Sequence, residues 1–321
     1  MPERILTVRV DRVTRLTPEI AAFEFVHPWA GTLPGYRAGA HVDVHLPGGF
    51  VRPYSLARAP EGASAARYVI GVEREPRSRG GSAALHERVR EGDLLAISTL
   101  RNTFSLHPEA AHHLLLAGGI GLTPLLAIAQ QLARDGAAFT LCVFARSRDH
   151  LAFAGGLAAL APHVRLHFDD PAAADKLDLA SLLAPRPEGT HLYLCGPAGF
   201  MQVALAHAAH WPDEAVHLDY FAPPYSAADA GHDEPFVLAL ARRGLEVPVA
   251  ADRTAVEALR ELGIDVPISC EQGVCGTCVV AWHAGGGEPD HRDHCLSATE
   301  RRTRVALCCS RATSGVLTID L

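Results

Sequence analysis

Three cysteines near one end of the chain place the strongest constraint on its fold. In the run CEQGVCGTC, four residues separate Cys270 from Cys275 and two separate Cys275 from Cys278. Thiolates at this spacing are typical of a [2Fe–2S] cluster, whereas zinc sites usually combine two CxxC pairs. Gly273 and Gly276 suit a loop that wraps closely around such a cluster, because glycine reaches positive φ at little cost. The sequence therefore predicts an iron–sulfur loop rather than a group of buried free thiols.

The fourth thiolate must lie downstream, where Cys295, Cys308 and Cys309 are the candidates. The position of Cys308 resembles that of the fourth ligand in plant-type ferredoxins. We therefore expect Cys308 to bind iron, Cys309 to pack beside it and Cys295 to play no part. The segment EPDHRDHC also contains His291 and His294. A second metal site there is conceivable, but a polar surface turn after a hairpin is the favoured interpretation.

Residues 1–106 have the pattern of an all-β domain. Apolar and polar residues alternate in the ranges 5–13, 20–26 and 41–46, and turn signals such as PGG and EGD separate these stretches. Several short strands of this kind indicate a small antiparallel barrel.

Two short runs in this range predict a flavin site. The run RPYS ends an expected strand and resembles one in the ferredoxin reductase-like flavoproteins. Its tyrosine can pack flat on an isoalloxazine, its arginine can bind a phosphate with two donors, and its serine can lie near the flavin N5 edge. The run RGGS precedes an expected helix, and such a turn suits the single phosphate of FMN, although Ser82 could simply cap that helix. The residues predicted to bind FMN are Arg52, Pro53, Tyr54, Ser55, Ile70, Val72, Arg79, Gly80, Gly81 and Ser82.

Residues 107–224 change to alternating strands and helices. Strands are expected over 113–117, 139–144, 164–168 and 191–195, and helices over 125–134, 150–160, 176–183 and 199–210. This alternation predicts a parallel α/β domain. Residues 225–234 are rich in Pro, Ala and Asp without periodicity, which indicates a linker, and residues 235–321 form the domain that carries the cysteine loop.

Two glycine-containing strand ends in the α/β domain predict a nicotinamide site. GGIGLTP follows one strand and CGPAGF follows a later one, and such turns can flank a dinucleotide at the carboxyl edge of a parallel sheet. GGIGLTP is not the GxGxxG fingerprint. Two arginines after the 139–144 strand could reach the ribose or phosphates of the dinucleotide, or could be solvated loop charges. Asp169 and Asp170 would repel a 2′-phosphate if they lie nearby, which favours NADH over NADPH. The residues predicted to contact NADH are Gly119, Ile120, Gly121, Thr123, Arg146, Arg148, Cys195, Gly196 and Pro197.

Bulk properties narrow the class of protein further. The chain has 321 residues, a formal net charge of −7 and 48% hydrophobic residues, so two or three domains are expected and nucleic acid is not expected as a partner. No apolar run reaches the length of a membrane helix, and the N-terminus lacks the apolar core of a signal peptide. We therefore expect a cytoplasmic, monomeric protein that does not enter a membrane.

RPYS, RGGS, GGIGLTP, CGPAGF and CEQGVCGTC…CCSR follow one another in a fixed order. In this the chain resembles, over essentially its whole length, the phthalate dioxygenase reductase family, which includes vanillate demethylase reductase subunits. The resemblance implies an FMN-binding antiparallel barrel, an NADH-binding α/β domain and a C-terminal plant-type ferredoxin domain of the β-grasp type. It also places Phe221, an aromatic residue just before the linker, near the flavin.

The resemblance implies the reductase component of a two-component aromatic oxygenase or demethylase. Such a protein takes a hydride from NADH onto FMN and passes single electrons through the [2Fe–2S] cluster to a Rieske-type oxygenase. A stand-alone NADH:flavin or quinone reductase with a vestigial ferredoxin domain is the alternative within enzymes. A non-enzymatic iron–sulfur redox sensor is the alternative outside them.

Overall fold

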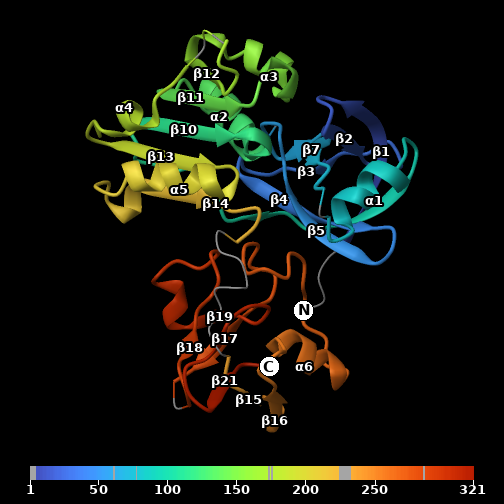
Figure 1. Ribbon diagram of the computed structural model, residues 1–321. Coiled ribbons are helices and arrows are strands. Elements are labelled where there is room, and N and C mark those ends of the chain that lie inside the picture. Colours follow the sequence, from blue (N-terminus) through green and yellow to red (C-terminus); the bar gives the residue numbers. More distant parts are fainter. Residues whose placement is uncertain are drawn as a thin grey trace. The chain divides into compact units, whose positions relative to one another are not determined.

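The protein is described here by a computed structural model that covers residues 5–60, 62–76, 78–172, 174, 176–223, 233–284 and 286–321 (Figure 1). The chain separates into two compact units, which divide between Phe221 and Ala222. The expected barrel and α/β regions share the N-terminal unit, and the cysteine loop belongs to the C-terminal unit. The predicted linker, residues 225–234, lies outside the described residues except for Asp233 and Glu234.

A seven-stranded antiparallel sheet forms the first half of the N-terminal unit, with strand order β5-β4-β8-β1-β2-β7 and β9 paired to β4. The sheet nearly closes into a barrel because Leu56, directly after β5, bridges Ile70 in β7. Alternate apolar side chains along the strands fill the interior. The elements are β1 (Ile5–Arg15), β2 (Ile20–Val26), β3 (Leu33–Pro34), β4 (Ala40–Leu46), β5 (Phe50–Ser55), β6 (Ser64–Ala65), β7 (Tyr68–Glu73), α1 (Gly81–Arg88), β8 (Leu94–Ser98) and β9 (Arg101–Asn102).

The second half of this unit is a five-stranded parallel sheet with strand order β12-β11-β10-β13-β14. The apolar face of α2 packs on one side of the sheet, and α4 and α5 pack on the other. The direction of strand addition reverses between β10 and β13, which makes their carboxyl ends the switch point where such sheets bind ligands. The elements are β10 (His112–Gly118), α2 (Leu122–Asp135), β11 (Phe139–Ala145), α3 (Ala154–Ala158), β12 (Val164–Phe168), α4 (Leu179–Leu183), β13 (Thr190–Cys195), α5 (Ala198–His207) and β14 (Val216–Asp219).

The C-terminal unit contains a five-stranded mixed sheet with strand order β16-β15-β21-β17-β19. Helix α6 packs against this sheet, and Thr254 and Glu257 form a capping box at its start. The antiparallel pairing of Val279 with Ala306 places Cys278 beside the chain that leads to Cys308. The elements are β15 (Phe236–Leu240), β16 (Leu245–Val249), α6 (Ala255–Glu261), β17 (Val279–His283), β18 (Pro289–Asp290), β19 (Arg304–Ala306), β20 (Arg311–Ala312) and β21 (Val316–Ile319).

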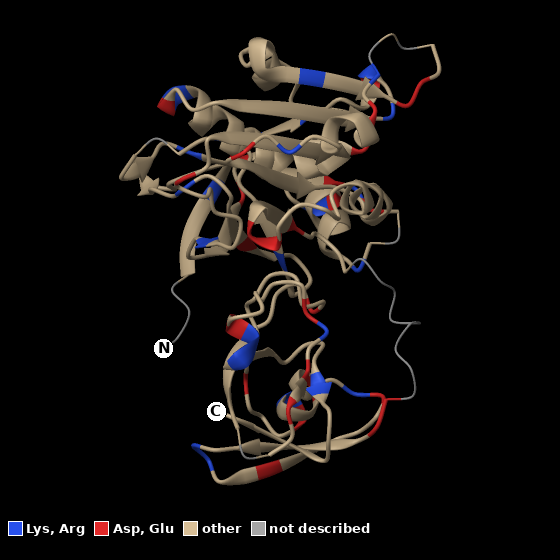
Figure 2. Ribbon diagram, turned by 90° about the vertical axis from the view of Figure 1, so that its left-hand side faces the viewer, with Lys and Arg blue, Asp and Glu red and all other residues tan. Residues whose placement is uncertain are grey.

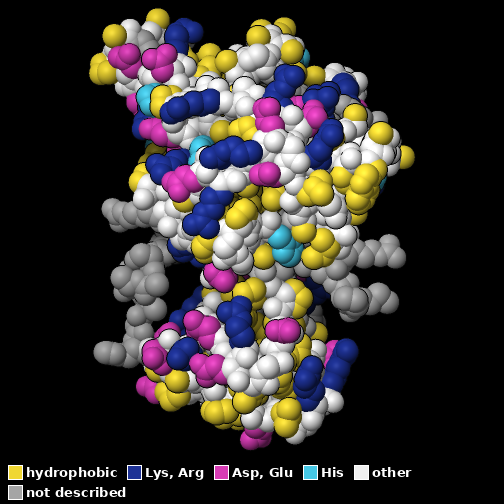
Figure 3. Space-filling model, turned by 90° about the vertical axis from the view of Figure 1, so that its right-hand side faces the viewer, with side chains coloured by type: hydrophobic (Ala, Val, Ile, Leu, Met, Phe, Trp, Pro, Cys, Tyr) yellow, Lys and Arg dark blue, Asp and Glu magenta, His cyan; other side chains and the backbone are white. Residues whose placement is uncertain are grey.

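Lys and Arg alternate along the ribbon with Asp and Glu (Figure 2), and charged side chains of both signs are interspersed on the face shown in Figure 3. Among the described residues, no helix is long and apolar enough to cross a membrane.

Arg311 closes the core of the C-terminal unit. Its buried guanidinium donates hydrogen bonds to the carbonyl oxygens of Arg253 at 2.8 Å, Glu234 at 2.9 Å and Ala250 at 3.1 Å, and it lies over the ring of Phe236. One side chain therefore holds the ends of β15 and β16 together.

Replacing Arg311 by Met should leave three carbonyl groups without their donor. Hydrogen bonds to a charged group contribute about 1.5–3 kcal/mol, so amides of β15 and β16 should exchange hydrogen roughly 30-fold faster, which corresponds to about 2 kcal/mol. Hydrogen exchange followed by mass spectrometry measures this change. Arg243→Met, at an exposed turn, is the control, and equal exchange in the two variants would contradict the assignment.

Candidate functional site

The two glycine turns predicted from the sequence meet at the switch point of the parallel sheet. Gly121 ends the short 3₁₀ turn between β10 and α2 and is the cap residue of α2, and Gly196 directly follows β13. A Cβ atom on Gly121 would lie 2.3 Å from the carbonyl oxygen of Cys195 and 2.6 Å from the amide nitrogen of Gly196. Only glycine allows the backbones to approach this closely. The structure thus brings GGIGLTP and CGPAGF together at one crevice-forming edge.

The barrel contacts this edge through β7. A Cβ atom on Gly71 would lie 2.7 Å from the Thr123 methyl group and 2.9 Å from the ring of Phe153. The side chains of Ile70 and Val72 point the other way and are buried in the barrel core. Of this strand, only the backbone around Gly71 faces the nicotinamide turn. The sequence did not single out Phe153, a non-glycine residue with φ of 55°.

Ser55 and Asp219 link the barrel to the parallel sheet. The Ser55 hydroxyl lies 3.4 Å from Oδ2 of Asp219, and Asp219 pairs in register with Cys195 on the neighbouring strand. Burial raises the pKa of Asp219 to about 7, and the Ser55 hydrogen bond opposes this shift. Burial, followed by the nearby Asp219 carboxylate, raises the pKa of Cys195 well above its usual value. The serine, the carboxyl and the thiol therefore form one polar group, in which the thiol is neutral and the carboxyl only partly ionised near pH 7.

Asp219 was missed in the sequence because β14 was not expected. The four residues VHLD form a short strand whose alternation is too brief to stand out. The pairing of β14 with β13 is what carries Asp219 to the flavin strand. Tyr54, next to Ser55, has its pKa raised by burial, against the opposing influence of Arg52.

Arg52 and the RGGS turn lie together at the start of α1. A Cβ atom on Gly81 would lie 2.6 Å from Cγ of Arg52, and the Arg52 guanidinium donates to the carbonyl oxygen of Arg79 at 3.4 Å. Ser82 does not cap the helix, since Gly80 occupies the cap position. The Ser78 hydroxyl accepts the amides of Gly80 at 3.2 Å and of Ala83 at 3.3 Å. Instead, the Ser82 hydroxyl accepts the Glu75 amide at 3.2 Å. A glycine-containing helix start beside an arginine suits a phosphate group.

The remaining predicted residues lie around the edge of the N-terminal unit. Arg146 forms an ion pair with Glu19 of the barrel, and the Arg148 guanidinium lies 5.2 Å from the ring centre of Phe168. Both arginines therefore already have partners within the chain. Phe221 ends the unit with 40% of its surface exposed.

Four cysteines converge in the C-terminal unit. Cys270, Cys275, Cys278 and Cys308 are all buried. Side-chain contacts join Cys270 to Cys275 and Cys308, and join Cys278 to Cys308. The contact with Cys275 lowers the pKa of Cys270, and the same contact raises the pKa of Cys275. These contacts place the four sulfur atoms in one connected group.

Backbone amides are aimed at the same sulfur atoms. Gln272 donates to Sγ of Cys270 at 3.4 Å and Gly273 donates to Sγ of Cys308 at 3.2 Å. Cys309 is placed differently, because its Sγ lies 3.9 Å from the carbonyl oxygen of Ala306. Thiols surrounded by amide donors are the arrangement that a [2Fe–2S] cluster needs, so the residues present fit that group.

Within the described ranges, no three His, Cys, Asp or Glu side chains converge on a point suited to one metal ion. A [2Fe–2S] site does not require such a point, because its four thiolates are shared between two irons. The interpretation of residues 288–295 as a polar surface turn is wrong in one respect. Asp293 in this segment is fully buried, since it packs against the cysteine loop.

A group of histidines in the parallel sheet was also missed. His107 stacks on His191 with ring centres 4.2 Å apart, and Nδ1 of His191 lies 3.0 Å from Nε2 of His217. His113 lies near them on the adjacent strand. Burial first, and the neighbouring histidines second, lower the pKa of His113 and of His217 to about 4. The sequence offered no signal for this group, because its members come from four separate segments.

Comparison with known proteins finds relatives of both units. Residues 238–313 match the model of the 2Fe-2S iron-sulfur cluster binding domain, and residues 98–216 match the N-terminal domain of dimethylamine monooxygenase subunit DmmA-like proteins. The chain is 45% identical to the vanillate O-demethylase oxidoreductase of Pseudomonas sp. (strain HR199 / DSM 7063), covering 99% of this chain and 100% of that protein.

Two solved structures resemble the whole chain. Phthalate dioxygenase reductase, described as a modular structure for electron transfer from pyridine nucleotides to [2Fe–2S], is 34% identical with a TM-score of 0.73, covering 99% of this chain and 98% of that one. An intact type IV self-sufficient cytochrome P450 monooxygenase is 35% identical with a TM-score of 0.89. The matched region covers 99% of this chain and 41% of that longer chain.

Fold and site together define an oxidoreductase that moves electrons through a flavin, a nicotinamide and an iron–sulfur centre. More particularly, the chain belongs to the family of oxygenase reductases that includes vanillate O-demethylase oxidoreductase and phthalate dioxygenase reductase. As a member of this family it supplies electrons to an oxygenase.

The raised pKa of Asp219 predicts a specific pH dependence of stability. Folding raises the pKa of Asp219 from 3.8 to about 7. The contribution of this carboxyl to the stability of the fold is therefore fully present below pH 3.8 and is lost as the pH rises through 7. Asp219→Asn, which cannot ionise, should therefore gain a few degrees in melting temperature over the wild type between pH 5 and 8. Asp213→Asn, at an exposed position, is the control. A difference from the wild type that is constant with pH would contradict the prediction.

The histidine group should produce the opposite dependence. Because the pKa of His217 falls from 6.5 to about 4 on folding, its contribution is present above 6.5 and is lost as pH falls through 4. When the pH is lowered from 7 to 5, the free energy of unfolding should therefore fall less in His217→Gln than in the wild type, by about 1 kcal/mol. Urea unfolding at the two pH values measures this. The exposed His207→Gln should behave like the wild type, and identical losses in all three proteins would refute the account.

Proposed function

We propose that this chain carries electrons from NADH through FMN and a [2Fe–2S] cluster to a Rieske-type oxygenase. The observation that carries the proposal is the presence of two complementary sites in one chain. The N-terminal unit joins a flavin-type strand to a nicotinamide-type turn, through Gly71 with Thr123 and through Ser55 with Asp219. The C-terminal unit groups four thiols with amides aimed at them.

The roles of the individual residues follow from their placement. Arg52 and the start of α1 would hold the flavin phosphate, Tyr54 would lie against the ring, and Phe221 would lie near the flavin. Proposed FMN contacts are Arg52, Pro53, Tyr54, Ser55, Ile70, Val72, Arg79, Gly80, Gly81, Ser82 and Phe221, the side chains of Ile70 and Val72 supporting the strand from the barrel core. Proposed NADH contacts are Gly119, Ile120, Gly121, Thr123, Arg146, Arg148, Cys195, Gly196 and Pro197. Proposed iron ligands are Cys270, Cys275, Cys278 and Cys308.

FMN would supply the conversion of a two-electron donor into single electrons. The protein residues position the cofactors and limit charge around them. The Ser55–Asp219 pair sits where a flavin edge and a nicotinamide would meet, and near pH 7 the Asp219 carboxyl can hold or release a proton. We propose domain limits of 1–106 for the barrel, 107–224 for the nicotinamide domain, 225–234 for the linker and 235–321 for the ferredoxin domain.

A heme-containing oxygenase is the second candidate for the protein that accepts the electrons. The extensive similarity to a self-sufficient cytochrome P450 monooxygenase favours it. The two candidates are distinguished by measuring steady-state electron transfer with NADH as donor. The purified protein is combined in turn with a purified Rieske-type oxygenase and a purified heme-containing oxygenase. Equal and slow transfer to both would overturn the Rieske assignment.

Substitutions of the cysteines test the order of the relay. Cys275→Ser should abolish NADH-dependent reduction of cytochrome c while NADH still bleaches the flavin, because only the exit site is damaged. Stopped-flow absorbance follows both events. The relay order is wrong if flavin reduction fails to the same degree.

The fourth ligand is tested by a matched pair of neighbouring cysteines. Cys308→Ser should lose the cluster, measured as iron and acid-labile sulfide per chain, because its sulfur contacts Cys270 and Cys278. Cys309→Ser should retain it. The reverse result would assign the ligand to Cys309.

A further inference from the structure

The segment DHRDHCL, residues 290–296, lies against the cysteine loop and has no role in the function proposed above. Its backbone meets the loop at Gly273. A Cβ atom on Gly273 would lie 3.0 Å from Cα of Asp293 and 2.5 Å from Sγ of Cys309. The φ angle of Gly273 is +74°, which a larger residue rarely adopts. No other residue type fits this position without displacing the segment.

A hydrogen bond fixes the loop to the segment at the same residue. The amide of His294 donates to the carbonyl oxygen of Gly273 at 2.9 Å. The amide of Gly273 donates to Sγ of Cys308 at 3.2 Å. The position of one glycine therefore couples the DHRDHCL segment to a sulfur of the proposed cluster.

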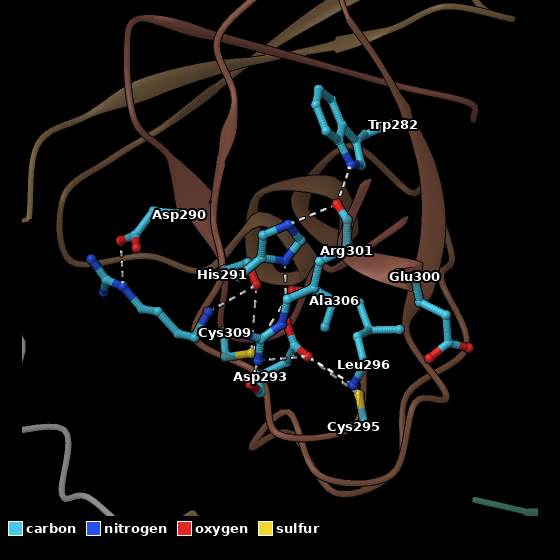
Figure 4. Close-up of polar contacts among 12 residues, drawn as sticks. Trp282, Asp290, His291, Asp293, Cys295, Leu296, Glu300, Arg301, Ala306 and Cys309 are labelled. Atoms are coloured by element: carbon cyan, nitrogen blue, oxygen red, sulfur yellow. Dashed lines mark hydrogen bonds and ion pairs between the residues drawn. The ribbon is translucent and has the colours of Figure 1, made fainter. Parts of the chain in front are cut away.

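The carboxylate of Asp293 holds the segment in this shape. Its side chain is fully buried. Oδ2 accepts the Leu296 amide at 3.0 Å and lies 3.5 Å from the Arg301 guanidinium. Oδ1 lies 3.3 Å from Nδ1 of His291. Figure 4 shows His291, Arg301 and Leu296 around this one carboxylate.

The partners of Asp293 are themselves fixed. Nε2 of His291 lies 3.1 Å from the carbonyl oxygen of Arg301, and the Trp282 indole donates to that oxygen at 3.0 Å. The Arg301 guanidinium also donates to the backbone carbonyl of Asp293. Trp282 lies on β17, so the network connects the segment to the central sheet (Figure 4). Connected polar networks of this kind favour a single local conformation.

We propose that Asp293 is a positioning residue that sets the reduction potential of the cluster by holding Gly273 against Cys308. This inference rests on the proposed function, in particular on Cys308 as a ligand. An amide donated to a ligand sulfur favours the reduced cluster, which carries more negative charge, and so raises the potential. Asp293 touches no ligand sulfur itself and acts through the backbone of the loop.

Two neutral variants separate positioning from charge. Asp293→Asn and Asp293→Ala both remove the negative charge, but only Asn keeps an oxygen that can accept the Leu296 amide. The potential of the Ala variant should therefore lie below that of the Asn variant by about 59 mV, a tenfold change in the one-electron equilibrium constant. Redox titration of the purified full-length protein, followed by electron paramagnetic resonance of the cluster, measures both values. Equal potentials for Asn and Ala would overturn the proposal.

A control and a milder variant complete the test. Asp290→Ala removes the same charge from the same segment, but Asp290 pairs with Arg292 and not with the loop, so its potential should stay at the wild-type value. If Asp293→Ala does not assemble a cluster, His291→Ala decides, since it frees only one carboxylate oxygen and should lower the potential less. An unchanged potential in His291→Ala, or a shift in Asp290→Ala as large as in Asp293→Ala, overturns the proposal. Absence of iron and sulfide from the wild-type protein would instead overturn the proposed function.

Discussion

Close approach of one backbone to another is the constraint on which the candidate sites depend. At Gly121 the turn after β10 touches the turn after β13, with no space for a side chain. At Gly273 the cysteine loop touches Cys309 and the segment that contains Asp293. Larger residues at either position would separate the groups that must act together. The barrel and the parallel sheet hold the backbones that meet at Gly121 in place, and the mixed sheet does the same for those that meet at Gly273.

The two units differ in whether the surroundings of their candidate sites disfavour or favour negative charge. In the N-terminal unit, burial raises the pKa of Asp219 and of Cys195. Near neutral pH the thiol is neutral and the carboxyl is only partly ionised, which limits negative charge at the edge where flavin and nicotinamide would meet. In the C-terminal unit, amide donors are directed at sulfur atoms, which favours negative charge there. A neutral environment suits hydride transfer between aromatic rings, and a donor-rich one suits a cluster that gains an electron.

Much of this arrangement could be predicted from the sequence. Period-two and period-3.6 patterns located β2 and β12 at their observed limits and identified the α/β region, because these elements bury one regular face. The cluster spacing and the glycine turns were also visible, since they are local. Asp219, the histidine group and Asp293 were not, because their roles arise only when distant segments pair. Asp293 shows this most clearly: a polar run suggested a surface turn, but its polar partners allow the carboxylate to be buried.

An anaerobic titration with NADH tests the central claim most directly. Flavin absorbance and the cluster signal are recorded in the same sample of the purified protein. The account predicts that NADH bleaches the flavin and that the cluster then becomes reduced. Flavin reduction with a cluster that stays oxidised would indicate a stand-alone reductase, and no reduction of either would indicate a redox sensor. Either of these results would contradict the account.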